Sequence, residues 1–213
     1  MNRLDMKRTA LDFRAATLAL ALWALGWSGC IQGGGTDIGN ALVMGTVRDE
    51  GQAVAGAKVL LMPEGYNPMV GDATGRARTA VADAQGRFSL RDVAPGRYSL
   101  ETLHPLVARM DLIPGLDVKA EGTLTAAPEL DAARTVYVRL PEGAAADAYV
   151  FIPGTDVFAM RADGDTTGEG EIRLRHVPRV PLPVVGLGRS ERAGEIALFE
   201  VSLGAEDTVL VLE

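Results

Sequence analysis

Residues 79–101, TAVADAQGRFSLRDVAPGRYSLE, contain two short segments in which apolar and polar side chains alternate. Alternation places Phe88, Leu90, Tyr98 and Leu100 on the inner side, and Arg87, Ser89, Arg91, Arg97, Ser99 and Glu101 on the outer side. A period of two residues is typical of strands that bury one face. The turns DAQG at 83–86 and APG at 94–96 supply the aspartate and glycine that tight reversals need. The stretch therefore predicts two strands bounded by turns.

The rest of the chain from Ala41 onward follows the same pattern. Short alternating segments are separated by glycine, proline and aspartate, and no long stretch has the period of a helix. This pattern predicts an all-β fold of the β-sandwich type.

One half of this region matches a known pattern. Residues 45–68, GTVRDEGQAVAGAKVLLMPEGYNP, together with 79–101, resemble the carboxypeptidase regulatory-like domain, a transthyretin-like β-sandwich, over about residues 41–115. The residues that carry the resemblance are Gly45, Val47, Gly51, Gly56, Ala57, Val59, Thr79, Gly86, Phe88, Gly96 and Tyr98. We assign residues 41–128 to this domain. The resemblance implies a fold and no peptidase activity, because the module is an accessory domain.

A second copy of the pattern follows the first. Val47 and Arg48 recur as Val138 and Arg139, Ala57, Val59 and Leu61 recur as Ala148, Val150 and Ile152, and GRFSLRDV at 86–93 recurs as GEIRLRHV at 170–177. The repeat predicts a second, divergent sandwich, transthyretin-like or immunoglobulin-like, over residues 129–213. The alternative is one larger sandwich in which the repeat reflects only the general pattern of strands.

The N-terminus has the features of an export signal. A basic segment precedes an apolar run from Ala15 to Trp27, which is shorter than the roughly 20 residues that a membrane-spanning helix needs. Ser28 and Gly29 then lead into Cys30, which resembles the lipobox of bacterial lipoproteins. We therefore predict a signal peptide over 1–29 and, over 30–40, a lipidated Cys30 followed by a flexible tether.

The lipobox interpretation also predicts where the protein lies. A lipid on Cys30 would anchor the chain to a membrane, and Ile31 is not the aspartate that retains lipoproteins at the inner membrane of enteric bacteria, so we expect the outer membrane or cell surface. The alternative is cleavage by ordinary signal peptidase at the small-x-small site that Gly26 and Ser28 form, which would leave a soluble periplasmic protein with a free thiol.

Charge excludes one class of partner. The chain has a formal net charge of −7, and residues 1–29 carry four basic and two acidic residues, so the mature chain has a charge of −9. An acidic chain does not bind a polyanion by releasing counterions, so we expect no nucleic-acid binding.

Catalytic patterns are missing from the sequence. Only two histidines are present: His104 precedes Pro105 at a strand end, and His176 occupies the repeat position that Asp92 holds in the first copy. There is no G-x-S-x-G motif, and cysteine and histidine show no zinc-binding spacing. We predict that the protein is not an enzyme and that it uses no metal or other cofactor besides the lipid on Cys30.

Two weak ligand sites remain as hypotheses. Asp163, Asp165 and Glu169 could present oxygens to calcium, although Leu174 stands where an EF-hand loop needs its glutamate. Tyr66 and Tyr149, the second expected to point outward from its strand, could contact a glycan. The prolines of VPRVPLP at 177–183 are interpreted as protecting an edge strand rather than recruiting a partner.

The sequence therefore predicts a non-catalytic lipoprotein of the envelope or cell surface that acts as a structural or interaction module. Its partners would be the membrane, through the lipid, and envelope proteins or polysaccharide. A surface protein that binds glycan or calcium is the alternative function.

Overall fold

The computed structural model describes residues 39–161, 166–167 and 171–212. The elements of the described residues are β-strands, and nothing among these residues forms a helix long and apolar enough to cross a bilayer. Residues 37–213 make one compact unit. The all-β prediction is confirmed.

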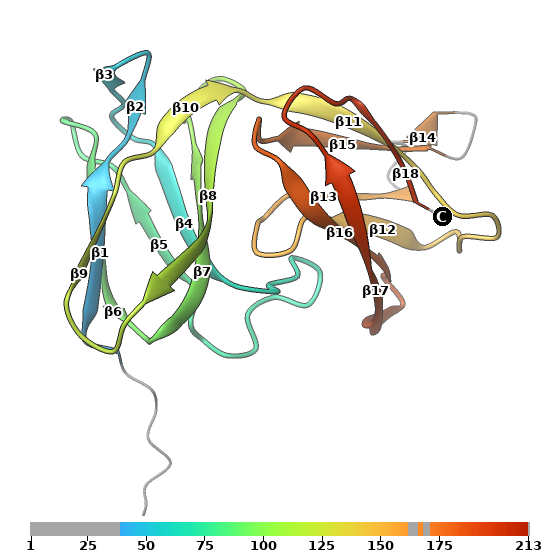
Figure 1. The fold of residues 1–213 in the computed structure, drawn as a ribbon, viewed down its shortest axis with the longest axis horizontal. Helices are drawn as coiled ribbons and strands as arrows, with labels where there is room; N and C mark the ends of the chain where they lie inside the picture. Colours follow the sequence, from blue (N-terminus) through green and yellow to red (C-terminus); the bar gives the residue numbers. More distant parts are fainter. Residues whose placement is uncertain (1–38, 162–165, 168–170, 213) are drawn as a thin grey trace, which may run out of the picture. The chain divides into compact units, whose positions relative to one another are not determined.

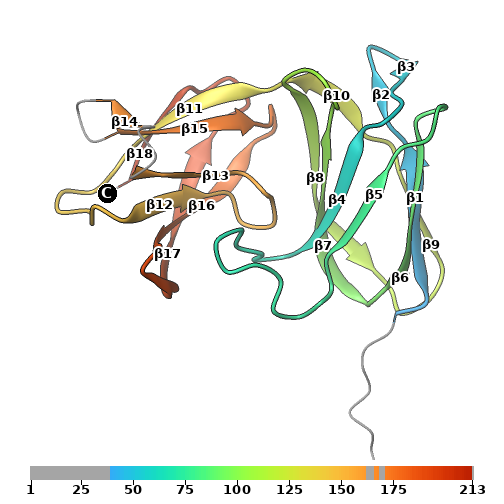
Figure 2. The same cartoon turned by 180° about the vertical axis from the view of Figure 1, so that it is seen from behind.

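The first sandwich consists of two sheets packed face to face (Figures 1 and 2). One sheet has the order β6 (Arg87–Val93), β1 (Ala41–Thr46), β9 (Thr123–Ala126). The other has the order β3 (Gln52–Ala53), β2 (Arg48–Asp49), β10 (Glu129–Ala132), β8 (Arg109–Val118), β7 (Gly96–Leu103), β4 (Lys58–Pro63), β5 (Arg78–Val81). Phe88, Leu90, Tyr98 and Leu100 lie in the core between them, as the alternation predicts.

The second sandwich also has two sheets. One has the order β14 (Thr166–Thr167), β15 (Glu171–Val177), β11 (Arg134–Arg139), β18 (Val209–Val211). The other has the order β13 (Phe158–Met160), β12 (Ala148–Phe151), β16 (Leu182–Arg189), β17 (Arg192–Leu203). A second apolar core, which includes Val138, Val150 and Ile172, lies between the two sheets.

The two sandwiches follow the same strand plan. β1 pairs antiparallel with β6 and parallel with β9, and β11 pairs in the same way with β15 and β18. In the other sheets, β4 lies between β5 and β7, and β12 lies between β13 and β16. The register pairs Gly45 with Phe88 and Val138 with Ile172. Val138 thus corresponds to Gly45 and not to Val47, so the predicted alignment of the first strand was wrong by two residues.

Both copies contain the same β-bulge. Arg91 and Asp92 of β6 oppose a single residue of β1, and Arg175 and His176 of β15 oppose a single residue of β11. Asp92 and His176 adopt the left-handed conformation, with φ of 54° and 55°. Aspartate and histidine are among the few side chains that enter this region readily. The exchange of aspartate for histidine between the copies therefore follows from the backbone of the bulge.

The prolines at 177–183 do not protect an edge. They lead into β16, which lies between β12 and β17 in its sheet, so this interpretation was wrong. Pro183 falls where the pairing of β16 with β17 is irregular. A bulge tolerates a residue that has no N–H to donate, which explains how an inner strand accommodates proline.

The large sheet of the first sandwich is buried on both faces. Leu60 and Met62 of β4 point away from the first core, yet they are only 2% and 5% exposed. Met110 and Leu112 of β8 belong to the second core. The second sandwich therefore covers the outer face of β4, β7 and β8. β10, residues 129–132, pairs with β8 and therefore belongs to the large sheet of the first sandwich. The division of the chain into two domains after residue 128 stays a prediction.

We expect the bulge conformation to constrain both repeats equally. Asp92→Val and His176→Val each place a β-branched side chain in the left-handed region, so each should lower the free energy of unfolding by about 1–2 kcal/mol. Asp92→Gly should stay close to the unmodified protein. Urea denaturation measures the difference, and Arg91→Val, one residue earlier on the same strand, is the control. An equal loss from Arg91→Val would contradict this account.

Candidate functional site

Hydrogen bonds between the two sandwiches define their junction. The backbone N–H of Asp156, in the loop after β12, donates to Oε2 of Glu101 on β7 at 2.7 Å. The N–H of Gly154 donates to the carbonyl of Tyr66 at 2.9 Å. Nζ of Lys58 lies 3.9 Å from a carboxylate oxygen of Asp156. The loop at 153–157 is thus held against β4, β7 and the segment that follows β4.

Glu101 is the most unusual ionisable group at the junction. It was predicted to point away from the first core, which is correct, but the second sandwich leaves it only 1% exposed. The pKa of Glu101 is raised to about 7, chiefly because the carboxyl is buried. The N–H of Asp156 and the charge of Lys58 oppose this rise, while the charge of Asp156 contributes to it. A carboxyl with this pKa is poised to change its protonation near neutral pH.

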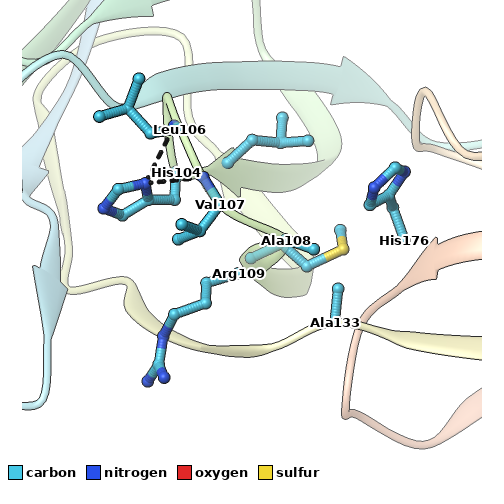
Figure 3. Close-up of a pocket in the computed structure, with 9 residues that line it drawn as sticks. His104, Leu106, Val107, Ala108, Arg109, Ala133 and His176 are labelled. Atoms are coloured by element: carbon cyan, nitrogen blue, oxygen red, sulfur yellow. Dashed lines mark hydrogen bonds between the residues drawn. The ribbon is translucent and has the colours of Figure 1, made fainter.

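One pocket at the junction brings together both histidines of the chain. Its volume is about 290 Å³, and it is lined by Leu103, His104, Leu106, Val107, Ala108, Arg109, Met110, Ala133 and His176. Figure 3 shows the two imidazoles on opposite sides of Ala108, His104 from the first sandwich and His176 from the second. The described residues include no hydrogen bond between the two rings, so the pocket presents no nucleophile and base in contact.

His104 has a structural role in its loop. Its Nδ1 accepts hydrogen bonds from the N–H groups of Leu106 at 3.1 Å and Val107 at 3.3 Å (Figure 3). An imidazole nitrogen that accepts these bonds carries no proton, so the neutral ring bears its proton on Nε2. The imidazole thus closes the turn between β7 and β8.

A second pocket shares Leu103 and His176 with the first. Its volume is about 270 Å³, and it is lined by Lys58, Glu101, Leu103, Asp156, Val157, Phe158, Ala159, Arg173, Arg175 and His176. Its wall contains apolar side chains from both sandwiches, and it also contains basic and acidic side chains. We call it the junction pocket. It offers hydrogen-bond donors, acceptors and one partly exposed aromatic ring, Phe158.

Tyr149 does not contact solvent. It was predicted to point outward from β12, and it does face away from the second core, but it is fully buried. Nδ2 of Asn67, from the first sandwich, donates to its hydroxyl at 2.8 Å. A Cβ atom on Gly188 would lie 2.4 Å from its ring, so glycine is needed where the ring crosses β16. The hypothesis that Tyr149 contacts a glycan at the surface was wrong, because the first sandwich covers this face.

Tyr66 lies half-buried at the junction. Burial raises the pKa of the Tyr66 hydroxyl, and the charges of Asp156, Asp72 and Glu101 raise it further. Its carbonyl binds the loop of the second sandwich, so the residue has a structural role whether or not it contacts a ligand.

Four predicted site residues, Cys30, Asp163, Asp165 and Glu169, lie outside the described residues. In the part of the chain that the structure describes, no group of three or more histidine, cysteine, aspartate or glutamate side chains is placed to hold a metal ion. Lipidation of Cys30 and calcium binding at 163–169 stay predictions.

Comparison with protein families identifies one domain. Residues 43–129 match the family model of the carboxypeptidase regulatory-like domain, which confirms that resemblance for this part of the chain. No curated protein matches the chain.

Solved structures show only distant likeness. A type II cohesin–X-dockerin complex from Acetivibrio cellulolyticus is 20% identical, with a TM-score of 0.31, over 44% of this chain and 58% of that chain. The major pilin SpaD from Corynebacterium diphtheriae is 10% identical, with a TM-score of 0.32, over 57% and 36%. The shaft pilin spaA from Lactobacillus rhamnosus GG is 9% identical, with a TM-score of 0.29, over 80% and 96%. At these TM-scores the likenesses carry no inference about function.

Burial of Glu101 predicts a pH dependence of stability. The folded protein holds the carboxyl proton up to about pH 7, whereas the unfolded chain releases it near pH 4.5. The stabilisation from the protonated form is therefore complete below pH 4.5 and is lost as the pH rises through 7, by up to about 3 kcal/mol. Glu101→Gln keeps an acceptor for Asp156 without the charge.

Urea denaturation of both proteins between pH 4 and pH 8 measures this effect. We expect Glu101→Gln to match the unmodified protein at pH 4 and to exceed it in stability at pH 8. If the difference in unfolding free energy between the two were the same at both ends of this range, the carboxyl would not be buried as described.

Proposed function

We propose that the protein is a membrane-anchored lipoprotein of the envelope or cell surface, without catalytic activity, that binds an extended segment of a partner protein by strand addition. The observation that carries the proposal is the edge strand β17. This strand has 12 residues, and among the strands that the structure describes it pairs only with β16. An edge strand of this kind offers backbone N–H and C=O groups to a partner strand.

The side chains of β17 favour such a contact. Its central residues, 196–199, carry no charge and no proline, and Ile196 and Leu198 are 45% and 58% exposed. Edge strands that avoid pairing usually carry charges, proline or bulges. A long edge without this protection in its centre is suited to accept another strand.

Another edge strand of the protein shows the contrast. β6, in the first sandwich, is also an edge, but it carries the bulge at Asp92 and exposes Arg87 and Arg91. Charge and bulge both oppose strand addition. β6 therefore serves as an internal comparison for β17.

Surface depressions beside β17 could give the contact specificity. Leu198 lines a groove of about 680 Å³ together with Leu112, Ile152, Val184 and several prolines. Ile196 lines a second pocket of about 460 Å³ with Leu187 and Ala197. In strand addition the backbone provides affinity, while pockets that accept alternate side chains distinguish one partner from another.

The membrane anchor of the proposal comes from the sequence around Cys30. Two or three acyl chains hold a protein stably at a membrane, whereas one gives only marginal binding. The acidic mature chain argues against nucleic acid as the partner.

Site-specific photocrosslinking in the native host tests the edge contact. A photoreactive residue replacing Leu198 should form a discrete crosslinked product with an envelope protein, whereas one replacing Ser89 on β6 should not. Adding Ile196→Lys should abolish the crosslinked product formed from position 198, because a lysine on the edge strand would have to be buried when the partner strand pairs with β17. Equal products from both positions, or none from Leu198, would contradict strand addition at β17.

Intact mass spectrometry of the protein from the host membrane fraction tests the anchor separately. We expect a chain that begins at Cys30 and carries two or three acyl chains. An unmodified chain beginning at Gly29 would mean that the protein is exported without a lipid. This result would leave the role of β17 untouched.

A further inference from the structure

The groove of about 680 Å³ beside β17 is lined by residues from both sandwiches. Its floor is apolar and nearly closed to solvent, since Leu112, Ile152 and Leu182 are 4%, 2% and 4% exposed. Its other apolar lining residues are Pro114, Pro153, Pro181, Pro183, Val184 and Leu198. We call it the proline groove.

The wall of the proline groove is poor in hydrogen-bond donors. Proline has no N–H, so four of the lining residues donate no backbone hydrogen bond. The N–H groups of two others, Glu64 and Ile152, already donate to the carbonyls of Arg97 and Val157, at 2.9 Å and 3.0 Å. The backbone of a peptide or the hydroxyls of a sugar would therefore lose hydrogen bonds to water inside the groove and gain few in return.

The proline groove offers neither a stacking surface nor an excess of one charge. Tyr98 is the aromatic residue among its lining residues, and it is fully buried, with its hydroxyl donating to the carbonyl of Ala94 at 2.8 Å. The charged lining residues, Glu64 and Arg97, have opposite signs, and Nη1 of Arg97 lies 3.5 Å from Oε1 of Glu64. A hydrocarbon chain needs neither a ring nor a charge, because its binding comes from the removal of apolar surface from water.

The proline groove lies at the end of the first sandwich where the N-terminal segment joins. Arg97 is at the start of β7, and Ala41, the first residue of β1, pairs with Val93, just before β7 (Figure 1). Residues 31–38 separate Cys30 from this end, and they span at most roughly 30 Å when fully extended. The predicted lipid on Cys30 would thus keep the groove close to a membrane, where acyl chains are abundant.

We propose that the proline groove binds the acyl chain of a membrane lipid, with the polar headgroup of the lipid outside the groove. Its volume of about 680 Å³ lies within the roughly 300–1,000 Å³ of pockets that enclose small ligands. Each methylene that leaves water for the groove adds to the binding. Strand addition uses the backbone of β17, whereas the acyl chain contacts side chains, so neither function requires the other.

Photolabelling of the full-length protein in lipid nanodiscs tests the proposal. The probe is palmitic acid with a diazirine in its chain, and mass spectrometry locates the labelled residues after irradiation. We expect label on the lining of the groove, at Leu182, Val184 and Leu198, and an excess of unlabelled palmitic acid should suppress it. Leu198→Glu should reduce the labelling of the groove at least about fivefold, because a carboxylate would lose its water when a hydrocarbon lies against it.

A matched variant on the same strand is the control. Ile196→Glu introduces the same charge two residues earlier on β17, where the side chain lines a different pocket, and should leave the labelling of the groove unchanged. Thermal unfolding of each variant verifies that it is folded. The proposal is overturned if the groove is not labelled, if unlabelled palmitic acid does not suppress the label, or if Leu198→Glu is labelled like the unmodified protein. Because the nanodiscs hold no partner protein, these results leave strand addition at β17 untouched.

Discussion

The features of this protein that bear on function depend on the burial of one sheet on both of its faces. β4, β7 and β8 pack on their own core with one face and on the second sandwich with the other, and Met110 and Leu112 are shared with the second core. This arrangement buries a carboxyl, that of Glu101, which keeps a hydrogen bond from the N–H of Asp156. A buried carboxylate is costly when it is charged, so the stability of the junction depends on pH.

Repeat symmetry explains the architecture, and its breakdown explains the candidate site. The same bulge places Asp92 and His176 at equivalent positions with nearly equal φ. In the second copy, the neighbouring arginine of the bulge, Arg175, lines a pocket that the first sandwich completes. Two similar modules thus produce a site that neither sequence pattern contains by itself.

For the strands to which it was applied, alternation in the sequence predicted correctly which side chains face the core, and it did not predict what covers the other side. Phe88 and Tyr98 were assigned to the core and are there. Tyr149 and Glu101 were assigned to the outer faces, which is also right, but the opposite sandwich buries both. The alignment error of two residues at Val138 has the same origin, because a shift by one full period keeps every side chain on its face. The junction pocket was not predictable for this reason: its residues come from β4, β7, β13 and β15, and only packing brings them together.

The most direct test of this account is the ionisation of Glu101 itself. The chemical shift of its side-chain carboxyl carbon, followed by NMR across the acid and neutral range, reports its pKa without reference to stability. A midpoint near pH 7 is the result that the buried junction predicts. A midpoint near 4.5, the usual value for glutamate, would show a solvated carboxyl and would contradict the packing of the second sandwich on β7.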